Sequence, residues 1–301
     1  LFANANNTPR VARIDLKTFK TVEILELPNS AGNHSSPFLT ENTEYVVAGT
    51  RFAVPTDDAN GDVPIDSFKE NFKGVLSFIG IDQQTGGMDL SFQIEAPGIN
   101  FDLSHAGKKK SGDWFFFSCY NSEKANTLLE VNASQNDKDF IMAVNWKKAA
   151  ELVKAGKGRK VTTEYAHNTW DESTHSATST MKKEVVVLSV EDMKDAMFMI
   201  PCPKSPHGCD VDPTGEYIIG SGKLAALIPV FSFDKMIKAI ADKNFAGEYD
   251  GVQVIKYEAA LHGEVQKPGL GPLHTEFDGK GNAYTSMFVS SEVVKWNIKD
   301  L

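Results

Sequence analysis

The chain has 301 residues, and its 31 Lys and Arg stand against 40 Asp and Glu, which gives a formal net charge of −9. This acidic balance argues against non-specific binding to nucleic acid or to a membrane surface. No stretch approaches the roughly 18 consecutive apolar residues of a transmembrane helix. The 3 cysteines are too few for a disulfide scaffold and fit no zinc-binding spacing.

Short alternating segments between turn residues dominate the chain and predict β-strands. The expected strands are Arg10–Asp15, Tyr45–Gly49, Val75–Asp82, Trp114–Cys119, Glu184–Ser189, Tyr217–Gly220, Pro229–Phe233 and Val293–Asn297. Two segments, Trp146–Ala155 and Phe233–Asp242, carry apolar residues at helical intervals and predict short helices between strands. We interpret the polar, Ser- and Thr-rich stretch Gly156–Lys183 as a long surface insertion.

An internal repeat indicates the architecture. The turn Asp212–Gly215 precedes the strand that begins at Tyr217, and the turn Asp278–Gly281 precedes the strand with Tyr284. Each unit then continues into a strand that ends in an aromatic residue followed by Asp or Asn. Serial meanders of this kind are typical of β-propeller blades, although a β-sandwich with similar turns is the alternative. We therefore predict an all-β propeller with short helical excursions.

Three of the histidines share one position in this repeat. His207 and His274 each lie 10 residues before the tyrosine that follows the turn, and His34 lies 11 residues before Tyr45. If each histidine begins the innermost strand of a blade, the three imidazoles point at a common axis. Convergent neutral imidazoles suit copper, zinc, iron or nickel. The alternative is that each is a hydrogen-bonding residue at the start of a strand.

The other histidines and the cysteines are interpreted from their immediate surroundings. We expect that His105 is not a ligand and that His167 and His175 lie on the surface of the polar insertion. Alternation around Cys119 predicts a buried thiol, and Cys209 is interpreted either as a neighbour of a metal or as a core residue.

Oxygen-bearing side chains cluster at residues 120–123 and again at 136–139. Carboxylates together with Tyr and backbone oxygens can bind a hard cation such as Ca²⁺. A solvated loop is the alternative interpretation of both clusters.

Several longer blocks resemble nitrous oxide reductase, in the order in which that family has them. The blocks are Asn4–Arg13, Leu27–His34, Ser118–Lys124, Ser205–Asp210 (SPHGCD), Gly269–Ser286 (GLGPLHTEFDGKGNAYTS) and Glu292–Asn297 (EVVKWN). They are long, unusual and spread from one end of the chain to the other, so the resemblance is specific.

The resemblance implies a seven-bladed β-propeller, incomplete over residues 1–301, that reduces nitrous oxide to dinitrogen and water. The reaction would take place at CuZ, a tetranuclear copper centre bridged by sulfide. Carried over position by position, His34, His207 and His274 match three of the family's seven histidine ligands. We expect the chain to be an internal piece of a longer protein, with the other ligands and a C-terminal cupredoxin domain with CuA outside it. The piece alone is expected to be inactive.

The resemblance also implies a calcium site. Tyr120, Glu123 and Asp137 match side-chain ligands, Val131 matches a backbone ligand, and Ser205 stands where the family often has Asn. The implied partners are nitrous oxide, a second copy of the chain that supplies CuA in a homodimer, and a cytochrome c or cupredoxin as electron donor. The implied compartment is the periplasm, with no nucleic acid and no membrane span.

Two other classes of protein remain open at this point. A non-catalytic propeller scaffold predicts that the three histidines lie apart in space. A propeller hydrolase predicts a single Ca²⁺ or Zn²⁺ in the channel and no sulfide.

Overall fold

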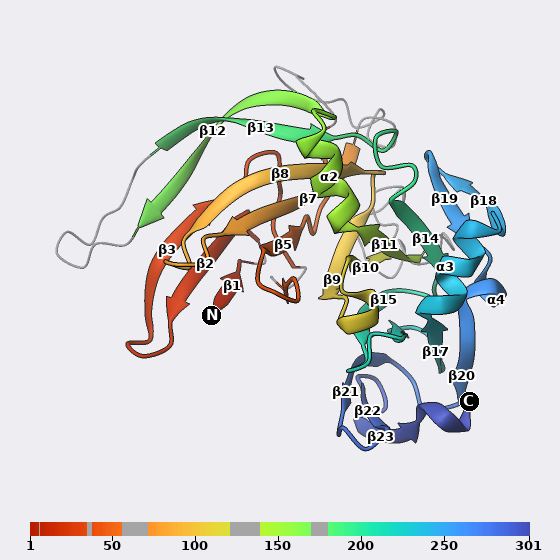
Figure 1. Cartoon of the computed structure of the whole chain (residues 1–301). Coiled ribbons are helices and arrows are strands. Elements are labelled where there is room, and N and C mark those ends of the chain that lie inside the picture. Colours follow the sequence, from red (N-terminus) through yellow and green to blue (C-terminus); the bar gives the residue numbers. More distant parts are fainter. Residues whose placement is uncertain (6, 35–37, 56–71, 121–138, 170–179) are drawn as a thin grey trace.

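A computed structural model describes the chain except for residues 6, 35–37, 56–71, 121–138 and 170–179. Successive sheets of mostly antiparallel strands follow one another along a curved arc, with a few short helices between strands (Figure 1). This arrangement confirms the prediction of an all-β propeller. Among the described residues, no helix is long and apolar enough to cross a membrane.

The strands of the described residues form four sheets. The first contains, in order across the sheet, β1 (Phe2–Asn4), β2 (Arg10–Asp15), β3 (Lys20–Glu26), β12 (Arg159–Thr169), β13 (Thr180–Leu188), β8 (Met88–Ala96), β7 (Phe72–Ile81), β5 (Tyr45–Gly49) and β4 (Phe38–Leu39), with β6 (Val54–Pro55) paired to β7. The second contains β18 (Phe245–Tyr249), β19 (Val252–Ile255), β14 (Met197–Pro201), β11 (Phe140–Asn145), β10 (Trp114–Tyr120) and β9 (Asn100–Ala106). The third contains β15 (Pro206–Val211), β16 (Tyr217–Gly222), β17 (Leu227–Ser232) and β20 (Leu261–Gln266), and the fourth β21 (Pro272–Phe277), β22 (Asn282–Met287) and β23 (Glu292–Asn297).

Both predicted helices begin directly after a strand. The described helices are α2 (Trp146–Lys154), α3 (Phe233–Ala241) and α4 (Tyr257–Ala260), with the 3-10 turns η2 (Lys109–Ser111) and η4 (Ile298–Asp300). The Asn145 side chain accepts a hydrogen bond from the Lys148 N–H at the start of α2, and Ser232 does the same for Lys235 in α3. These side chains satisfy backbone donors that the first turn of a helix leaves free, so the chain can change from strand to helix without a loop.

Strand β10 separates two parts of the core. Phe115 and Phe117 are buried on one side of it, and Phe116 is buried on the other side together with Cys209. Side chains alternate between the faces of a strand, so a strand that is apolar on both faces is packed on both. Cys119 is fully buried, as predicted, and burial raises the pKa of its thiol above the ordinary value.

In each of the two predicted turns, an aspartate side chain accepts hydrogen bonds from the backbone. The carboxylate of Asp212 accepts hydrogen bonds from the N–H groups of Thr214 and Tyr217 at 3.0 and 2.8 Å. Asp278 accepts one from the Lys280 N–H at 2.8 Å in the corresponding turn. An Asp that binds the backbone two residues on stabilises a tight turn, which explains why this residue marks the repeat.

Most described residues of the predicted surface insertion 156–183 are exposed or half-buried, but the segment forms strands of the first sheet rather than irregular structure. β12 and β13 pair from Arg159 with Val187 to Ala166 with Thr180, and they lie between β3 and β8 in the first sheet (Figure 1). β13 pairs in parallel with β8, and β12 pairs with β3. The Thr content was misleading because Thr is β-branched and favours strands when one face is packed. Here that face buries Tyr165.

His167 is likewise not the surface residue that the sequence predicted. Its side chain is 14% exposed, and Nε2 lies 2.7 Å from Oε1 of the buried Glu23. Glu23 also accepts hydrogen bonds from the Met88 N–H and from Nε of Arg13, so one carboxylate joins β2, β3, β8 and β12. Burial alone would raise the pKa of Glu23, but these hydrogen bonds hold it below the ordinary value. His175 lies outside the described residues.

Replacing Glu23 with Gln should lower the free energy of unfolding by about 2 kcal/mol near neutral pH, because buried donors lose a charged acceptor. A carboxyl group with a depressed folded-state pKa contributes stability above its unfolded pKa, and this stability is lost as the pH falls through the folded pKa. As the pH is lowered, the free energy of unfolding measured in urea should therefore fall more for the wild type than for E23Q. The control is E26Q on the same strand, whose partner Arg10 is exposed; an equal effect of E26Q would contradict the assignment.

Candidate metal centre

Two of the three predicted histidines lie near the start of strands at the edges of their sheets. β9, β15 and β21 are edge strands of their sheets, and β15 contacts both of the others (Figure 1). His207 is the second residue of β15, and His274 is the third residue of β21. His34 precedes β4, the strand at the end of its own sheet, which contacts β9. The repeated position thus corresponds to the start of a strand for His207 and His274, whereas His34 lies outside a strand.

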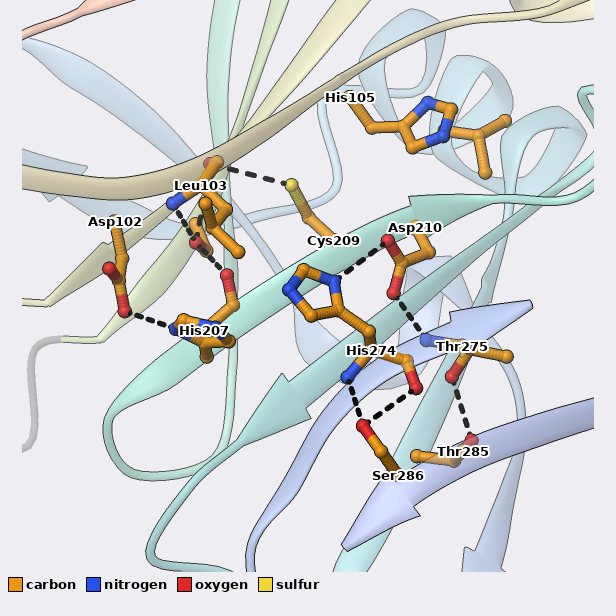
Figure 2. Close-up of polar contacts among 12 residues, drawn as sticks. Asp102, Leu103, His105, His207, Cys209, Asp210, His274, Thr275, Thr285 and Ser286 are labelled. Atoms are coloured by element: carbon orange, nitrogen blue, oxygen red, sulfur yellow. Dashed lines mark hydrogen bonds and ion pairs between the residues drawn. The ribbon is translucent and has the colours of Figure 1, made fainter. Parts of the chain in front are cut away.

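The three imidazole rings form one contiguous group. The ring centroids of His34 and His207 are 5.9 Å apart, and those of His207 and His274 are 5.0 Å apart. Figure 2 shows the second pair on neighbouring strands. The scaffold alternative predicted that these side chains lie apart in space, and the structure contradicts that prediction.

A buried carboxylate faces two of the rings. Asp102 on β9 is 2% exposed, its Oδ2 lies 2.8 Å from Nδ1 of His207, and its Oδ1 contacts Nδ1 of His34. The ammonium of Lys223 donates to Oδ2 at 3.1 Å. Burial alone would raise the pKa of Asp102, but hydrogen bonds from His207 and His34 and the charge of Lys223 hold it well below the ordinary value. Asp102 is therefore ionised at neutral pH.

A second carboxylate faces the third ring. Oδ1 of Asp210 on β15 lies 3.5 Å from Nδ1 of His274, and Oδ2 accepts the N–H of Thr275 at 2.6 Å (Figure 2). The contact with Asp210 raises the pKa of His274 against the effect of burial. The hydroxyl of Thr275 lies 2.7 Å from that of Thr285, which accepts the indole N–H of Trp296 at 2.9 Å. A chain of hydrogen bonds thus runs from the outermost strand of the fourth sheet to Asp210.

All three rings therefore turn Nδ1 toward a carboxylate. A histidine that donates Nδ1–H to a carboxylate is held in one tautomer and presents Nε2 as a lone-pair donor. Imidazole nitrogens with such partners fit copper. Among the residues that the structure describes, no three His, Cys, Asp or Glu side chains meet the geometry for holding one metal ion together.

Gly208 sets the distance between β15 and β21. A Cβ atom at this position would lie 2.1 Å from the backbone oxygen of Leu273. That contact is far below van der Waals distance, and its partner is backbone, which cannot turn away. Any side chain here must push β21, and with it His274, away from Asp210.

Gly208→Ala should therefore lower the free energy of unfolding by about 3 kcal/mol, the upper range for overpacking. Gly87→Ala is the control, because its Cβ would meet only the end of the Thr85 side chain, at 3.2 Å, and should cost below about 1 kcal/mol. Denaturant unfolding of both variants makes the comparison. A G208A protein as stable as the wild type would show that the two strands do not depend on this close approach.

The neighbouring histidine and cysteine have other partners. The ring of His105 stacks on Phe38 with centroids 4.6 Å apart, Nδ1 lies 2.7 Å from the Ala106 carbonyl, and burial lowers the pKa of His105 to about 4. Cys209 is 1% exposed, and its thiol points to the carbonyl of Phe116 at 3.4 Å. Of the two interpretations of Cys209, the structure supports the core residue.

Most of the expected calcium ligands cannot be placed. Three of them fall in the undescribed segment 121–138, namely Glu123, Val131 and Asp137. Tyr120 ends β10, and its side chain is also outside the description. Ser205 is buried, and its N–H donates to the Asp139 carboxylate at 2.8 Å. The calcium site stays a prediction.

Neither of the carboxylates that face the histidines, Asp102 and Asp210, was predicted from the sequence. Asp102 stands between Phe101 and Leu103 in a strand that is almost entirely buried. A charge in the middle of a buried strand requires a partner, and this signal could have identified it. Asp210 belongs to the SPHGCD block, but nothing local shows that its partner is on the next sheet.

These features define the class of the protein, an all-β propeller whose inner strands group histidines against buried carboxylates. Along its whole length the chain is related to nitrous-oxide reductase. It is 34% identical over 304 residues to the nitrous-oxide reductase of Pseudomonas fluorescens and 32% identical over 303 residues to that of Stutzerimonas stutzeri. Each alignment covers 100% of this chain and 41% of the relative, so the chain spans about two fifths of the length of these relatives.

No family model matches the chain. The chain aligns with the solved structure of the periplasmic gluconolactonase PpgL of Pseudomonas aeruginosa at 12% identity and a TM-score of 0.46, covering 98% of this chain and 63% of that one. It aligns with the β-propeller domain of Cps50 (Swd1) from Myceliophteria thermophila at 12% identity and a TM-score of 0.38, covering 99% and 79%.

Proposed function

We propose that the protein containing this chain reduces nitrous oxide to dinitrogen and water at a copper–sulfide centre. His34, His207 and His274 would provide three of its ligands. The observation that carries the proposal is the contiguous group of three imidazoles whose Nδ1 atoms face carboxylates. The similarity to nitrous-oxide reductases over the whole chain supports it.

The substrate explains why such a site is needed. Nitrous oxide is a weakly polar, poor ligand with an inert N–O bond, and its reduction consumes two electrons and two protons. No ordinary side chain supplies those electrons. A copper–sulfide centre, when bound, supplies electrons to the substrate, while the protein provides orientation and access.

The residues of this chain would bind that centre and orient its ligands. In this proposal His34, His207 and His274 serve only as ligands through Nε2, and Asp102 and Asp210 keep their rings in one tautomer and one orientation. His207 and His274 are on strands β15 and β21, which hold a side chain more firmly than a loop does.

The remaining components are proposed from the resemblance. Electrons would reach the site from CuA in a cupredoxin domain of the second subunit of a homodimer, supplied by a cytochrome c or a cupredoxin in the periplasm. A calcium ion would bind through the expected ligands, which are Tyr120, Glu123, Val131 and Asp137. Residues 1–301 would form part of the N-terminal propeller domain.

Replacement of His207 or His274 by Ala should test the ligand role in the full-length protein. Each variant should lose most of its bound copper, and its consumption of nitrous oxide with a reduced dye as donor should fall by more than about 100-fold, beyond the effect of losing an outer partner. Copper per chain is measured by elemental analysis, and substrate consumption by gas chromatography.

His262→Ala is the matched control, because that ring packs against Tyr217 with centroids 4.8 Å apart, away from the group of three. Normal copper content and activity in H207A would refute the proposal. A single Zn²⁺ or Ca²⁺ per chain with hydrolytic activity would favour the hydrolase class instead.

A further inference from the structure

Lys223 lies where three parts of the inner surface meet. It follows β16, its side chain is 16% exposed, and its Nζ donates to Oδ2 of Asp102 at 3.1 Å. Its backbone N–H donates to the carbonyl of Ser205 at 2.8 Å, just before β15. Its own carbonyl would lie 3.3 Å from a Cβ placed on Gly271, just before β21. The residue is thus held by its backbone next to β15 and by its ammonium to β9.

We propose that Lys223 is a positioning residue, whose ammonium holds the Asp102 carboxylate with one oxygen toward His34 and the other toward His207. Nothing in the sequence assigns this role. The identity of what the rings bind rests on the proposed function, whereas the orientation of the carboxylate does not.

The buried charge is the reason that a lysine is needed. A carboxylate that is 2% exposed is costly unless an opposite charge and hydrogen bonds compensate it. The contacts with His34 and His207 occupy both carboxylate oxygens. Lys223 adds a permanent positive charge, and its ammonium lies within hydrogen-bond distance of the oxygen that also faces His207.

The geometry explains how one ammonium can orient two rings. The carboxylate of Asp102 could turn about its Cβ–Cγ bond and exchange its oxygens or tilt them away from the rings. Lys223 and His207 both contact Oδ2, so this oxygen is held from two sides, and Oδ1 is left facing His34. When the carboxylate is fixed, both rings keep Nδ1 on it and keep Nε2 available.

The test compares Lys223→Met, which keeps the length and removes the charge, with Lys223→Arg, which keeps a charge. Lys183→Met is the matched control, because Lys183 also pairs with a carboxylate, that of Asp89 at 2.5 Å, but on β13. The full-length, copper-free proteins are titrated with Cu(I) against a colorimetric chelator, and their thermal unfolding is recorded. K223M should weaken Cu(I) binding by about 10- to 100-fold, the usual effect of losing an outer partner of a ligand. K223R should recover most of this loss, and K183M should bind like the wild type.

Cu(I) binding by K223M equal to that of the wild type would overturn the proposal, and so would equal weakening in K183M. If K223M does not fold, the uncharged Lys223→Gln takes its place against K223R. If the wild type itself binds no Cu(I), the proposed function fails, and crystal structures of the metal-free variants then decide the role of Lys223. Loss of the contact between Asp102 and His207 in K223M supports the role, and a retained contact overturns it.

Discussion

A buried negative charge governs the arrangement of the inner strands. Asp102 sits on β9 among apolar side chains, and its partners His34, His207 and Lys223 come from segments far from it in the sequence. Since an unpaired buried charge is expensive, the fold is favourable only when all of these segments are in place together. The same requirement that stabilises the inner surface therefore also sets the relative positions of the imidazoles.

The fourth sheet shows that the inner surface depends on the outer strands as well. The hydrogen bonds from Trp296 through Thr285 and Thr275 reach Asp210, which faces His274. Each member of this chain is oriented by the next, and every one of its hydroxyl, indole and carboxylate groups has a partner. Such connected buried networks specify one arrangement of side chains more strongly than apolar packing does. The close approach at Gly208 adds a steric limit to the same junction.

The sequence was sufficient where the signal is local. The strands Arg10–Asp15 and Tyr45–Gly49 have the predicted bounds because alternation and turn residues lie within a few positions. The register of the histidines could be recognised because a repeat places equivalent residues at equal distances from a turn.

Contacts between residues far apart in the sequence could not be predicted. The contact of Asp102 with Lys223 spans 121 residues, and that of Glu23 with His167 spans 144. No pattern within either segment indicates its partner. For the same reason β12 was taken for an insertion, because whether a Thr-rich segment becomes a strand depends on the surface it can pack against.

The hairpin of β12 and β13 has a consequence for the order in which the chain folds. β3 and β8 are made early in synthesis, but the strands that pair with their free edges lie at 159–188. Contacts of such high sequence separation slow folding, and an unpaired strand edge is a template for association with other chains. During synthesis there is therefore a stage in which β3 and β8 are complete but each still has one unpaired edge. Residues 159–188 then protect strand edges that were made before them.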